Sequence, residues 1–297
     1  MRGAYVLVGN EIKDYETGGF LRIDDLGFTR GIAVCTAIES KGGIFFNPEK
    51  HKERLKLSAA MARIPLRNAV GWRHLFGNLA RLDTRCRLKE SLIYVYITRG
   101  RGYRNWKPYG RPQIYAFVLS GNRRTAPMKV FATNAHHRNT PAIKTTNYLS
   151  GHVAWTDLGE PDDVLYVDSA TNEVLESATK NIFVVRRDSQ LQTPPAQGKI
   201  LNGVTRQIIL SIAREEKGFK ELAGQPIFPC VEETSINFNE MIADAKRGLV
   251  TGVVLASTTT VAPVQSINGV QIQISQKTKD FCEQFLRYRE AYYAKYR

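Results

Sequence analysis

The chain has 297 residues, and its 42 lysines and arginines against 28 aspartates and glutamates give a formal net charge of +14. Its hydrophobic fraction of 43% and charged fraction of 24% are ordinary for globular proteins, which excludes a wholly disordered or fibrous chain. The length exceeds what one hydrophobic core usually reaches, so we expect two domains.

The sequence carries no signal for a membrane or for secretion. No stretch approaches the roughly 20 uninterrupted apolar residues that a bilayer span needs, and the first residues, MRGAYVLVGNEIKDYE, lack the apolar region of a secretory signal. We therefore expect a cytoplasmic protein. The four cysteines lie far apart, with no CxxC pair and no histidine at metal-ligand spacing, so we expect reduced thiols and no metal site.

The densest positive charge lies in residues 99–111, where arginines and a lysine alternate with aromatic side chains. Taken alone, such a run is typical of surfaces that grip phosphates and stack nucleic-acid bases. A site for small anionic ligands fits the same field. We keep a nucleic-acid-binding module as an alternative, although the residues discussed below favour a carboxylate-binding site.

The first 120 residues have the pattern of a smaller α/β domain. Residues 4–12 alternate apolar and polar positions up to a Gly-Asn turn, which predicts the first strand of a hairpin. Asn47-Pro48 predicts a helix start, and Leu55, Ala59 and Ala62 follow at helical spacing. Residues 91–98 and 113–119 are rich in β-branched and aromatic residues and predict two further strands.

A second domain is expected after a linker. Residues 121–127, GNRRTAP, contain glycine and proline without apolar periodicity, so we place the linker at 121–133 and the larger domain at 134–297. There, residues 163–168 and 181–187 predict strands, and 204–216 predict a helix with apolar residues on one face. Residues 277–297 predict a terminal amphipathic helix.

Three segments carry candidate chemistry. Lys144 follows the apolar Ile143, which suggests partial burial, and a desolvated lysine has a lowered pKa and becomes a nucleophile or base. Glu176 lies between two apolar strands, where a carboxylate needs a specific partner. Residues 201–206 lead through a glycine into a helix, the arrangement that presents free N–H groups to an anion. Taken singly, each segment also fits an ordinary surface lysine, turn glutamate or helix start.

Taken together, the segments resemble the class IV pyridoxal-phosphate aminotransferases, which include branched-chain aminotransferases, D-amino acid aminotransferases and 4-amino-4-deoxychorismate lyase. Lys-x-x-Asn-Tyr-Leu from Lys144 matches the family's lysine segment, and HKERL at 51–55 matches its phosphate-binding arginine. The resemblance runs from about Leu26 to residue 272. The family's central pattern is matched by Glu176, Ala178, Asn181, Ile182, Phe183, Leu191, Thr193, Leu201, Gly203, Val204 and Arg206.

This resemblance implies pyridoxal 5'-phosphate as the cofactor. Lys144 would form the Schiff base with the cofactor aldehyde and move a proton during the reaction, while Glu176 would pair with the pyridinium nitrogen. Leu201 would pack on the ring, and Tyr148 would lie near the ring's 3' oxygen. The residues implied to hold the phosphate are Arg54, Gly203, Val204, Thr205 and Ser257 or Thr258.

The substrate side departs from the family pattern. The usual Asp-Arg-Gly-aromatic segment is Asp25-Leu26-Gly27-Phe28 here, and Cys35 and Thr36 replace an aromatic residue and a glutamate. Tyr96 stands where branched-chain enzymes have an arginine two residues after a tyrosine, here Tyr94. The segment TRGRGYRN resembles the D-amino acid enzymes' loop, which makes Arg104 a carboxylate anchor, or else the lyase's Arg-Gly-Tyr signature at residues 101–103.

We therefore expect a transaminase that uses an amino acid or related amine and a 2-oxo acid, with the D-amino acid type as one candidate. The alternatives are the lyase, a branched-chain aminotransferase and a cofactor-binding protein that has lost activity. The family implies two α/β domains with the cofactor in the cleft between them, and a homodimer. The expected substrate residues are Phe28, Arg30, Tyr94, Tyr96, Arg99 and Arg104.

Overall fold

The computed structural model describes residues 2–17, 21–66, 71–103, 107–215, 219 and 226–296. The chain divides into two compact units: Met1–Asn122, Ile143–Asn147 and Tyr292–Arg297 form the first, and Arg123–Ala142 and Tyr148–Ala291 form the second. The five residues from Ile143 thus belong to the first unit while their neighbours on both sides belong to the second. The sequence does not indicate this return, and the expected bounds 1–120, 121–133 and 134–297 stay a prediction.

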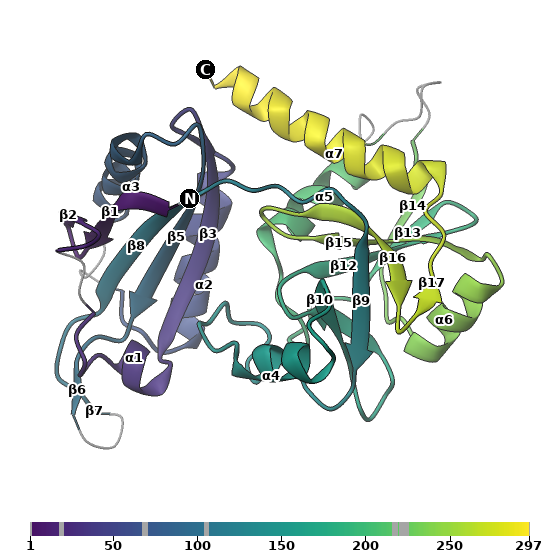
Figure 1. Cartoon of the computed structure of the whole chain (residues 1–297), viewed down its shortest axis with the longest axis horizontal. Helices are drawn as coiled ribbons and strands as arrows, with labels where there is room; N and C mark the ends of the chain where they lie inside the picture. Colours follow the sequence, from purple (N-terminus) through teal and green to yellow (C-terminus); the bar gives the residue numbers. More distant parts are fainter. Residues whose placement is uncertain are drawn as a thin grey trace. The chain divides into compact units, whose positions relative to one another are not determined.

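The first unit contains an antiparallel six-stranded sheet in the order β2-β1-β8-β5-β3-β4 (Figure 1). The hairpin expected near the amino terminus is confirmed, since β1 and β2 pair with Val8 opposite Glu11. A separate two-stranded ribbon, β6 and β7, follows β5. The strands are β1 (Arg2–Val8), β2 (Glu11–Asp14), β3 (Ala33–Lys41), β4 (Ile44–Phe45), β5 (Glu90–Thr98), β6 (Gly102–Tyr103), β7 (Lys107–Pro108) and β8 (Gln113–Ser120).

Helices α2 (Pro48–Met61) and α3 (Trp72–Cys86) cover one face of this sheet, and the short α1 (Leu26–Arg30) precedes β3. Alternate residues of β5, namely Ile93, Val95 and Ile97, join the core that these helices bury. The predicted helix start at Asn47-Pro48 is confirmed. Asn47 does not cap through its side chain, because its backbone is left-handed at φ 48°.

The second unit contains a mixed nine-stranded sheet in the order β11-β10-β9-β16-β15-β12-β13-β14, with β17 paired to β16. The strands predicted around residues 163–168 and 181–187 are confirmed as β10 and β12. The strands are β9 (Met128–Thr133), β10 (Asp163–Val167), β11 (Val174–Ser177), β12 (Asn181–Arg186), β13 (Gln190–Thr193), β14 (Cys230–Glu233), β15 (Val250–Ala256), β16 (Val261–Ile267) and β17 (Val270–Gln271).

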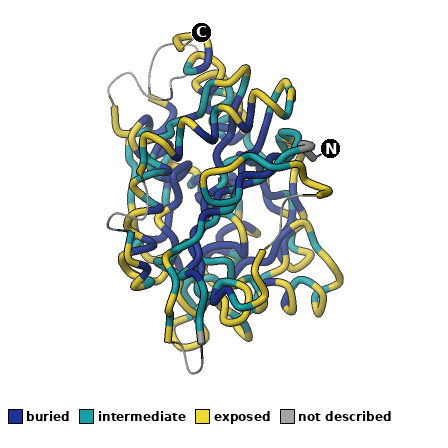
Figure 2. Tube along the Cα trace, turned by 90° about the vertical axis from the view of Figure 1, so that its left-hand side faces the viewer, coloured by how far each residue is buried: buried dark blue, intermediate teal, exposed yellow. Residues whose placement is uncertain are grey.

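Strand β12 of the second unit is buried on both faces. Ile182 and Val184 of β12 enter a core shared with α6 (Phe238–Lys246), whereas Phe183 between them meets Phe281 of α7 (Gln276–Lys295) at 6.0 Å between ring centroids. The other two helices are α4 (Leu149–Asp157) and α5 (Val204–Arg214). In Figure 2, buried segments of the chain, in dark blue, are linked by exposed segments, in yellow.

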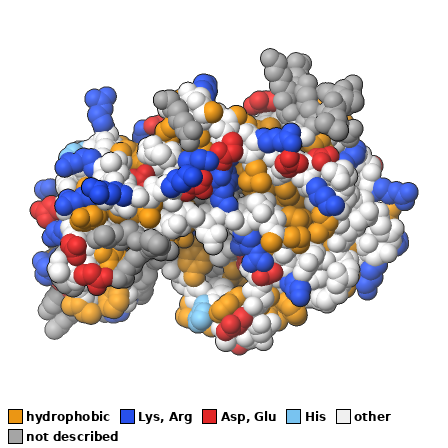
Figure 3. Space-filling view, turned by 45° about the horizontal axis from the view of Figure 1, so that its top comes forward, with side chains coloured by type: hydrophobic (Ala, Val, Ile, Leu, Met, Phe, Trp, Pro, Cys, Tyr) orange, Lys and Arg blue, Asp and Glu red, His pale blue; other side chains and the backbone are white. Residues whose placement is uncertain are grey.

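The positive charge is dispersed over one face of the molecule. On the face shown in Figure 3, lysine and arginine side chains are spread out, and several lie beside acidic side chains. Some of the arginines are neutralised locally in ion pairs, such as Arg124 with Asp162 at 2.8 Å. This face does not have the continuous basic stripe that is typical of nucleic-acid-binding proteins. Among the residues that the structure describes, no helix combines the length and the apolar character that a bilayer crossing requires.

The contact between β15 and α7 is tight enough to test the packing of the second unit. A Cβ added to Gly252 would lie 1.9 Å from Oγ1 of Thr278, which is fully buried. We expect Gly252→Ala to lower the free energy of unfolding by about 1–3 kcal/mol, because the strand or the helix must shift. Urea denaturation measures this loss.

The matched control for this substitution is Gly77→Ala in α3, where a Cβ meets nothing within 4 Å. The free energy of unfolding of this variant should be unchanged or up to about 1 kcal/mol higher, because alanine has a higher helix propensity than glycine. Equal stabilities for the two variants would contradict the packing described here.

Candidate active site

The buried carboxylate of Glu176, on β11, receives three donors within the second unit. The glutamate is 3% exposed. Arg138 Nη1 lies 3.3 Å from Oε1, the Leu201 N–H donates to the same oxygen at 3.1 Å, and Asn181 Nδ2 donates to Oε2 at 3.2 Å. A carboxylate so far from water is tolerated only with such partners. The specific partners that the sequence argument required are therefore present.

Asn181 joins this carboxylate to the start of α5. Its Nδ2 also donates to the Leu201 carbonyl at 2.8 Å, and its Oδ1 would lie only 2.1 Å from a Cβ on residue 203. Glycine is therefore required at 203 for steric reasons. Gly203 caps α5 without a side-chain hydrogen bond, so Val204 and Thr205 begin the helix with backbone N–H groups that no side chain of the cap satisfies. Such a helix start is suited to a phosphate.

The Ser257-Thr258 turn lies beside the same part of the sheet. It follows β15, whose last residue, Ala256, pairs with Asn181 of β12. The turn is closed by the Ser257 N–H, which donates to the Thr260 carbonyl at 2.6 Å. The structure thus brings together, in the second unit, the segments that carry Glu176, the start of α5 and this turn.

Arg138 is a site residue that the sequence reasoning missed. Besides contacting Glu176, its guanidinium carbon lies 5.9 Å from the ring centre of Tyr148, the residue that precedes α4. Arg138 therefore contacts two of the residues expected at the cofactor. It comes from the segment NAHHRNTPA, residues 134–142, which has no periodicity that would single out one residue.

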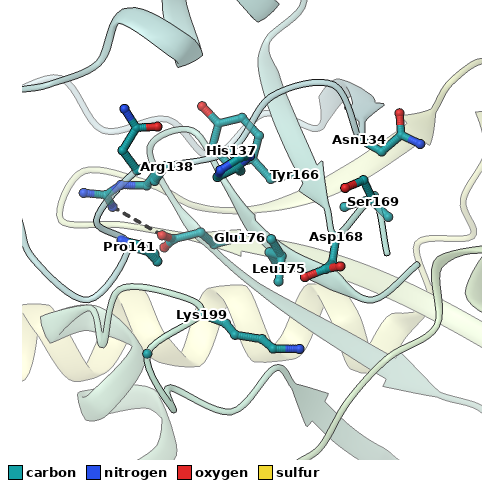
Figure 4. Close-up of a pocket in the computed structure, with 13 residues that line it drawn as sticks. Asn134, His137, Arg138, Pro141, Tyr166, Asp168, Ser169, Leu175, Glu176 and Lys199 are labelled. Atoms are coloured by element: carbon teal, nitrogen blue, oxygen red, sulfur yellow. Dashed lines mark hydrogen bonds and ion pairs between the residues drawn. The ribbon is translucent and has the colours of Figure 1, made fainter. Parts of the chain in front are cut away.

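A cavity of about 300 Å³ opens beside this carboxylate (Figure 4). Figure 4 shows Arg138 directed toward Glu176, with Tyr166 and His137 on one side and Lys199 on the other. The cavity combines polar side chains with apolar ones such as Val167 and Leu175, which suits a ligand with a ring and several hydrogen-bonding atoms. Its walls are formed by Asn134, His137, Arg138, Asn139, Pro141, Tyr166, Val167, Asp168, Ser169, Leu175, Glu176, Gly198 and Lys199.

The backbone of Lys144 is fixed on both sides within the first unit. Its N–H donates to Ser58 Oγ of α2 at 3.2 Å, and its carbonyl accepts from the Cys35 N–H of β3 at 2.9 Å. Thr145 adds a β-bridge to Val34. Ser58 lies one helical turn beyond Arg54 on α2, so the backbone of the half-buried Lys144 is anchored to the same helix that carries Arg54. Sequence reasoning identified Lys144 but missed Ser58 and Cys35.

Arg54 is held by a buried pair of side chains. Its Nη2 donates to Thr36 Oγ1 at 2.5 Å, and the same oxygen lies 2.8 Å from Nδ1 of His51. Both Thr36 and His51 are 1% exposed. Burial, and to a lesser degree the charge of Arg54, hold the pKa of His51 well below its usual range, so its ring is neutral at physiological pH.

The expected substrate residues occupy two places in the first unit. Tyr94 and Tyr96 stack at 6.4 Å between ring centroids, and Phe117 of β8 stacks on both. They alternate with the core residues of β5 and so lie on the sheet face opposite α2 and α3. Phe28, 58% exposed, and Arg30 lie on α1.

The basic run begins in a network centred on Asp24. Arg101 Nε donates to Asp24 Oδ2 at 2.8 Å, the Tyr109 hydroxyl donates to the same oxygen at 2.6 Å, and Arg101 also lies over the Tyr109 ring. The bonds from Tyr109 and then Arg101 hold the pKa of Asp24 well below its usual range. Arg99 Nη1 donates to the Gly110 carbonyl at 3.3 Å. Arg104 lies outside the described residues.

The contacts of Asp24 bear on the two resemblances of the TRGRGYRN segment, to the loop of the D-amino acid enzymes and to the Arg-Gly-Tyr signature of the lyase. Arg101, the first residue of the lyase-like Arg-Gly-Tyr segment, already has a carboxylate and an aromatic ring as partners within the unit. Its contacts are those of a residue that fixes the loop. Arg99 and Arg104 remain the arginines of the run that we expect at a substrate carboxylate.

The chain was compared with known families and proteins. The sequence model described as Amino-transferase class IV matches residues 33–267. A D-alanine aminotransferase of Listeria monocytogenes is 26% identical over 279 residues, which cover 90% of this chain and 89% of that protein.

Two solved structures share the fold. The branched-chain aminotransferase of Thermoproteus uzoniensis, determined with norvaline, superposes with a TM-score of 0.80 at 20% identity, covering 97% of this chain and 95% of that one. A Legionella pneumophila structure provisionally named 4-amino-4-deoxychorismate lyase superposes with a TM-score of 0.78 at 20% identity, covering 92% and 97%. At such identities these structures show a common fold and no more.

The role of Asp24 can be tested by proteolysis. We expect Asp24→Asn to speed tryptic cleavage within residues 99–111 severalfold, because the neutral amide no longer pairs with Arg101 and the basic segment opens more often. Mass spectrometry of the first fragments measures the rate. Asp157→Asn, at a carboxylate 64% exposed on α4, is the control and should leave the rate unchanged. Equal rates for all three proteins would mean that backbone bonds, such as Leu26 N–H to the Gly100 carbonyl, hold the segment alone.

Proposed function

The chain belongs to the class IV amino-transferase family, and we propose that it is a pyridoxal-phosphate-dependent transaminase that moves an amino group between an amino acid and a 2-oxo acid. The observation that carries this proposal is the buried carboxylate of Glu176, which pairs with Arg138 and accepts the Leu201 N–H. A carboxylate held in this way can stabilise a protonated ring nitrogen.

Pyridoxal phosphate, when bound, supplies an aldehyde that reacts with amines and a protonated ring that withdraws electrons from the donor's Cα. The part of this chain is to hold and orient that group. Glu176 would accept the ring N–H, and Leu201, whose N–H and carbonyl are both bonded, would present its side chain to a ring face. The Arg138 guanidinium lies over the ring of Tyr148, whose hydroxyl would donate to the 3' oxygen of the cofactor.

The phosphate is assigned to charged and backbone donors. The first turn of α5 offers the N–H groups of Val204 and Thr205 behind Gly203, and Arg54 offers a guanidinium oriented by Thr36. The helix dipole and the arginine charge both favour a dianion. The hydroxyls of Ser257 or Thr258 add neutral donors.

Lys144 is assigned the covalent link and the proton transfer. Its backbone N–H and carbonyl are hydrogen-bonded to Ser58 Oγ and to the Cys35 N–H. Only the four-carbon side chain therefore has to move. Because the backbone is fixed, the amine can reach only a small volume. Within it, the amine would take the proton from the donor's Cα and deliver it to the adjoining C4' atom of the cofactor.

We infer that the donor is an amino acid, with D-amino acids the first class to test. The support is the D-alanine aminotransferase that matches nine tenths of this chain. The donor's carboxylate is assigned to Arg104 or Arg99, and its side chain to the wall of Tyr94 and Tyr96 on the open face of β5. Phe28 and Arg30 on α1 are the remaining substrate candidates.

We also propose a homodimer. Leu149 and Val153 lie four residues apart on α4 and are 69% and 37% exposed, so they form an apolar strip on one side of that helix. A second copy of the chain is the partner that the family favours for such a strip.

The function is tested by the visible spectrum of the purified protein with pyridoxal phosphate. We expect the absorption of lysine-bound cofactor, which is bleached when D-alanine is added and returns with 2-oxoglutarate. Lys144→Ala should lose this absorption and at least about 10⁴-fold of the turnover, since the covalent link and the proton carrier are removed together. Lys13→Ala is the matched control, because Lys13 is 38% exposed on the edge strand β2 and pairs with Glu11.

Three results would contradict parts of this account. Retention of the lysine band in Lys144→Ala would overturn the role of Lys144. Turnover with L-alanine but not D-alanine would overturn the donor class. Release of pyruvate from 4-amino-4-deoxychorismate without any amino acceptor would replace the transaminase by the lyase.

A further inference from the structure

The hydrogen bond between Arg54 and Thr36 has a fixed direction. A hydroxyl has one proton and two acceptor positions, and the Arg54 guanidinium can only donate. Thr36 Oγ1 therefore accepts from Arg54, at 2.5 Å, and its own proton is free for the other neighbour, Nδ1 of His51, at 2.8 Å. We assign this proton to Nδ1 as the accepting nitrogen, which places the histidine proton on Nε2.

The burial of the three residues makes this order persistent. Thr36 and His51 are each 1% exposed, so water does not compete for the hydroxyl, and the pKa of His51 is lowered well below its usual range by burial and by Arg54. A neutral His51 keeps its acceptor. The residues come from two rigid elements, since Thr36 lies in β3 and His51 precedes Arg54 by three residues on the same face of α2.

We propose that Thr36 and His51 are positioning residues for Arg54, and that their hydrogen-bond relay aims its guanidinium at the cofactor phosphate. This inference rests on the proposed function. Neither residue touches the phosphate in this account. Their part is to remove rotational freedom from the Arg54 side chain, so that less entropy is lost when the phosphate binds. The sequence alone marks Thr36 only as a departure from the family pattern.

The test separates the phosphate from the rest of the cofactor. The dissociation constants of the apoprotein are measured for pyridoxal phosphate and for pyridoxal, which has the same ring and aldehyde but no phosphate. Thr36→Val keeps the shape of the side chain and removes the hydroxyl. We expect it to weaken pyridoxal phosphate about tenfold, the effect of one hydrogen bond to a charged group, and pyridoxal less than about twofold.

Two further variants distinguish positioning from a general structural effect. Thr36→Ser retains the hydroxyl and should restore tight binding of pyridoxal phosphate. His51→Leu removes the acceptor and should weaken pyridoxal phosphate in the same way. Because both residues act through one relay, the double variant Thr36→Val/His51→Leu should bind no more weakly than Thr36→Val alone.

The possible failures point to different claims. Equal loss for both ligands, no loss for either, a serine variant as weak as the valine variant, or independent additive losses would each overturn the relay while leaving the proposed function intact. A wild-type protein that binds neither ligand would overturn the proposed function and the relay together. Circular dichroism and urea denaturation of each variant establish that the comparison is made on folded protein.

Discussion

A carboxylate 3% exposed to solvent, at Glu176, is the constraint on which the second unit's candidate site depends. Its charge cannot be left uncompensated without a cost of several kcal/mol, so the chain supplies Arg138, the Asn181 amide and the Leu201 N–H. These donors come from three separate segments, and all three are held in place by contacts with the Glu176 carboxylate oxygens. Asn181 then leaves no room for a Cβ at residue 203, which determines how α5 begins. One buried charge thus fixes a loop, a strand start and a helix start.

In the first unit, neutral groups hold the functional side chains in place. Its β3 and α2 fix the backbone of Lys144 through Cys35 and Ser58, and they orient Arg54 through Thr36 and His51. In both units the functional side chain projects from an element whose own polar atoms are already satisfied. Rigid placement of this kind is what proximity and electrostatic catalysis require, because the protein does not reorganise when charge moves.

The sequence predicts those parts of the site that are encoded locally. Lys144, Glu176 and the turn into α5 are found because residues close together in the chain carry the pattern, and the strands of both sheets follow from β-branched and aromatic runs. Arg138, Ser58 and the Thr36–His51 pair are not found, since their partners lie 15 to 86 residues away and only the folded chain brings them together. The role of Asp24 is hidden for the same reason. The arginines assigned to the candidate site are only a small part of the excess of positive charge, which is +14.

The central claim is that Glu176 pairs with the ring nitrogen of the cofactor. The most direct measurement compares the dissociation constants of the wild-type apoprotein for pyridoxal phosphate and for its 1-deaza analogue, in which carbon replaces that nitrogen. The account predicts that pyridoxal phosphate binds about 10- to 100-fold more tightly, the range expected for a hydrogen bond between charged partners. Equal dissociation constants for the two ligands would contradict it.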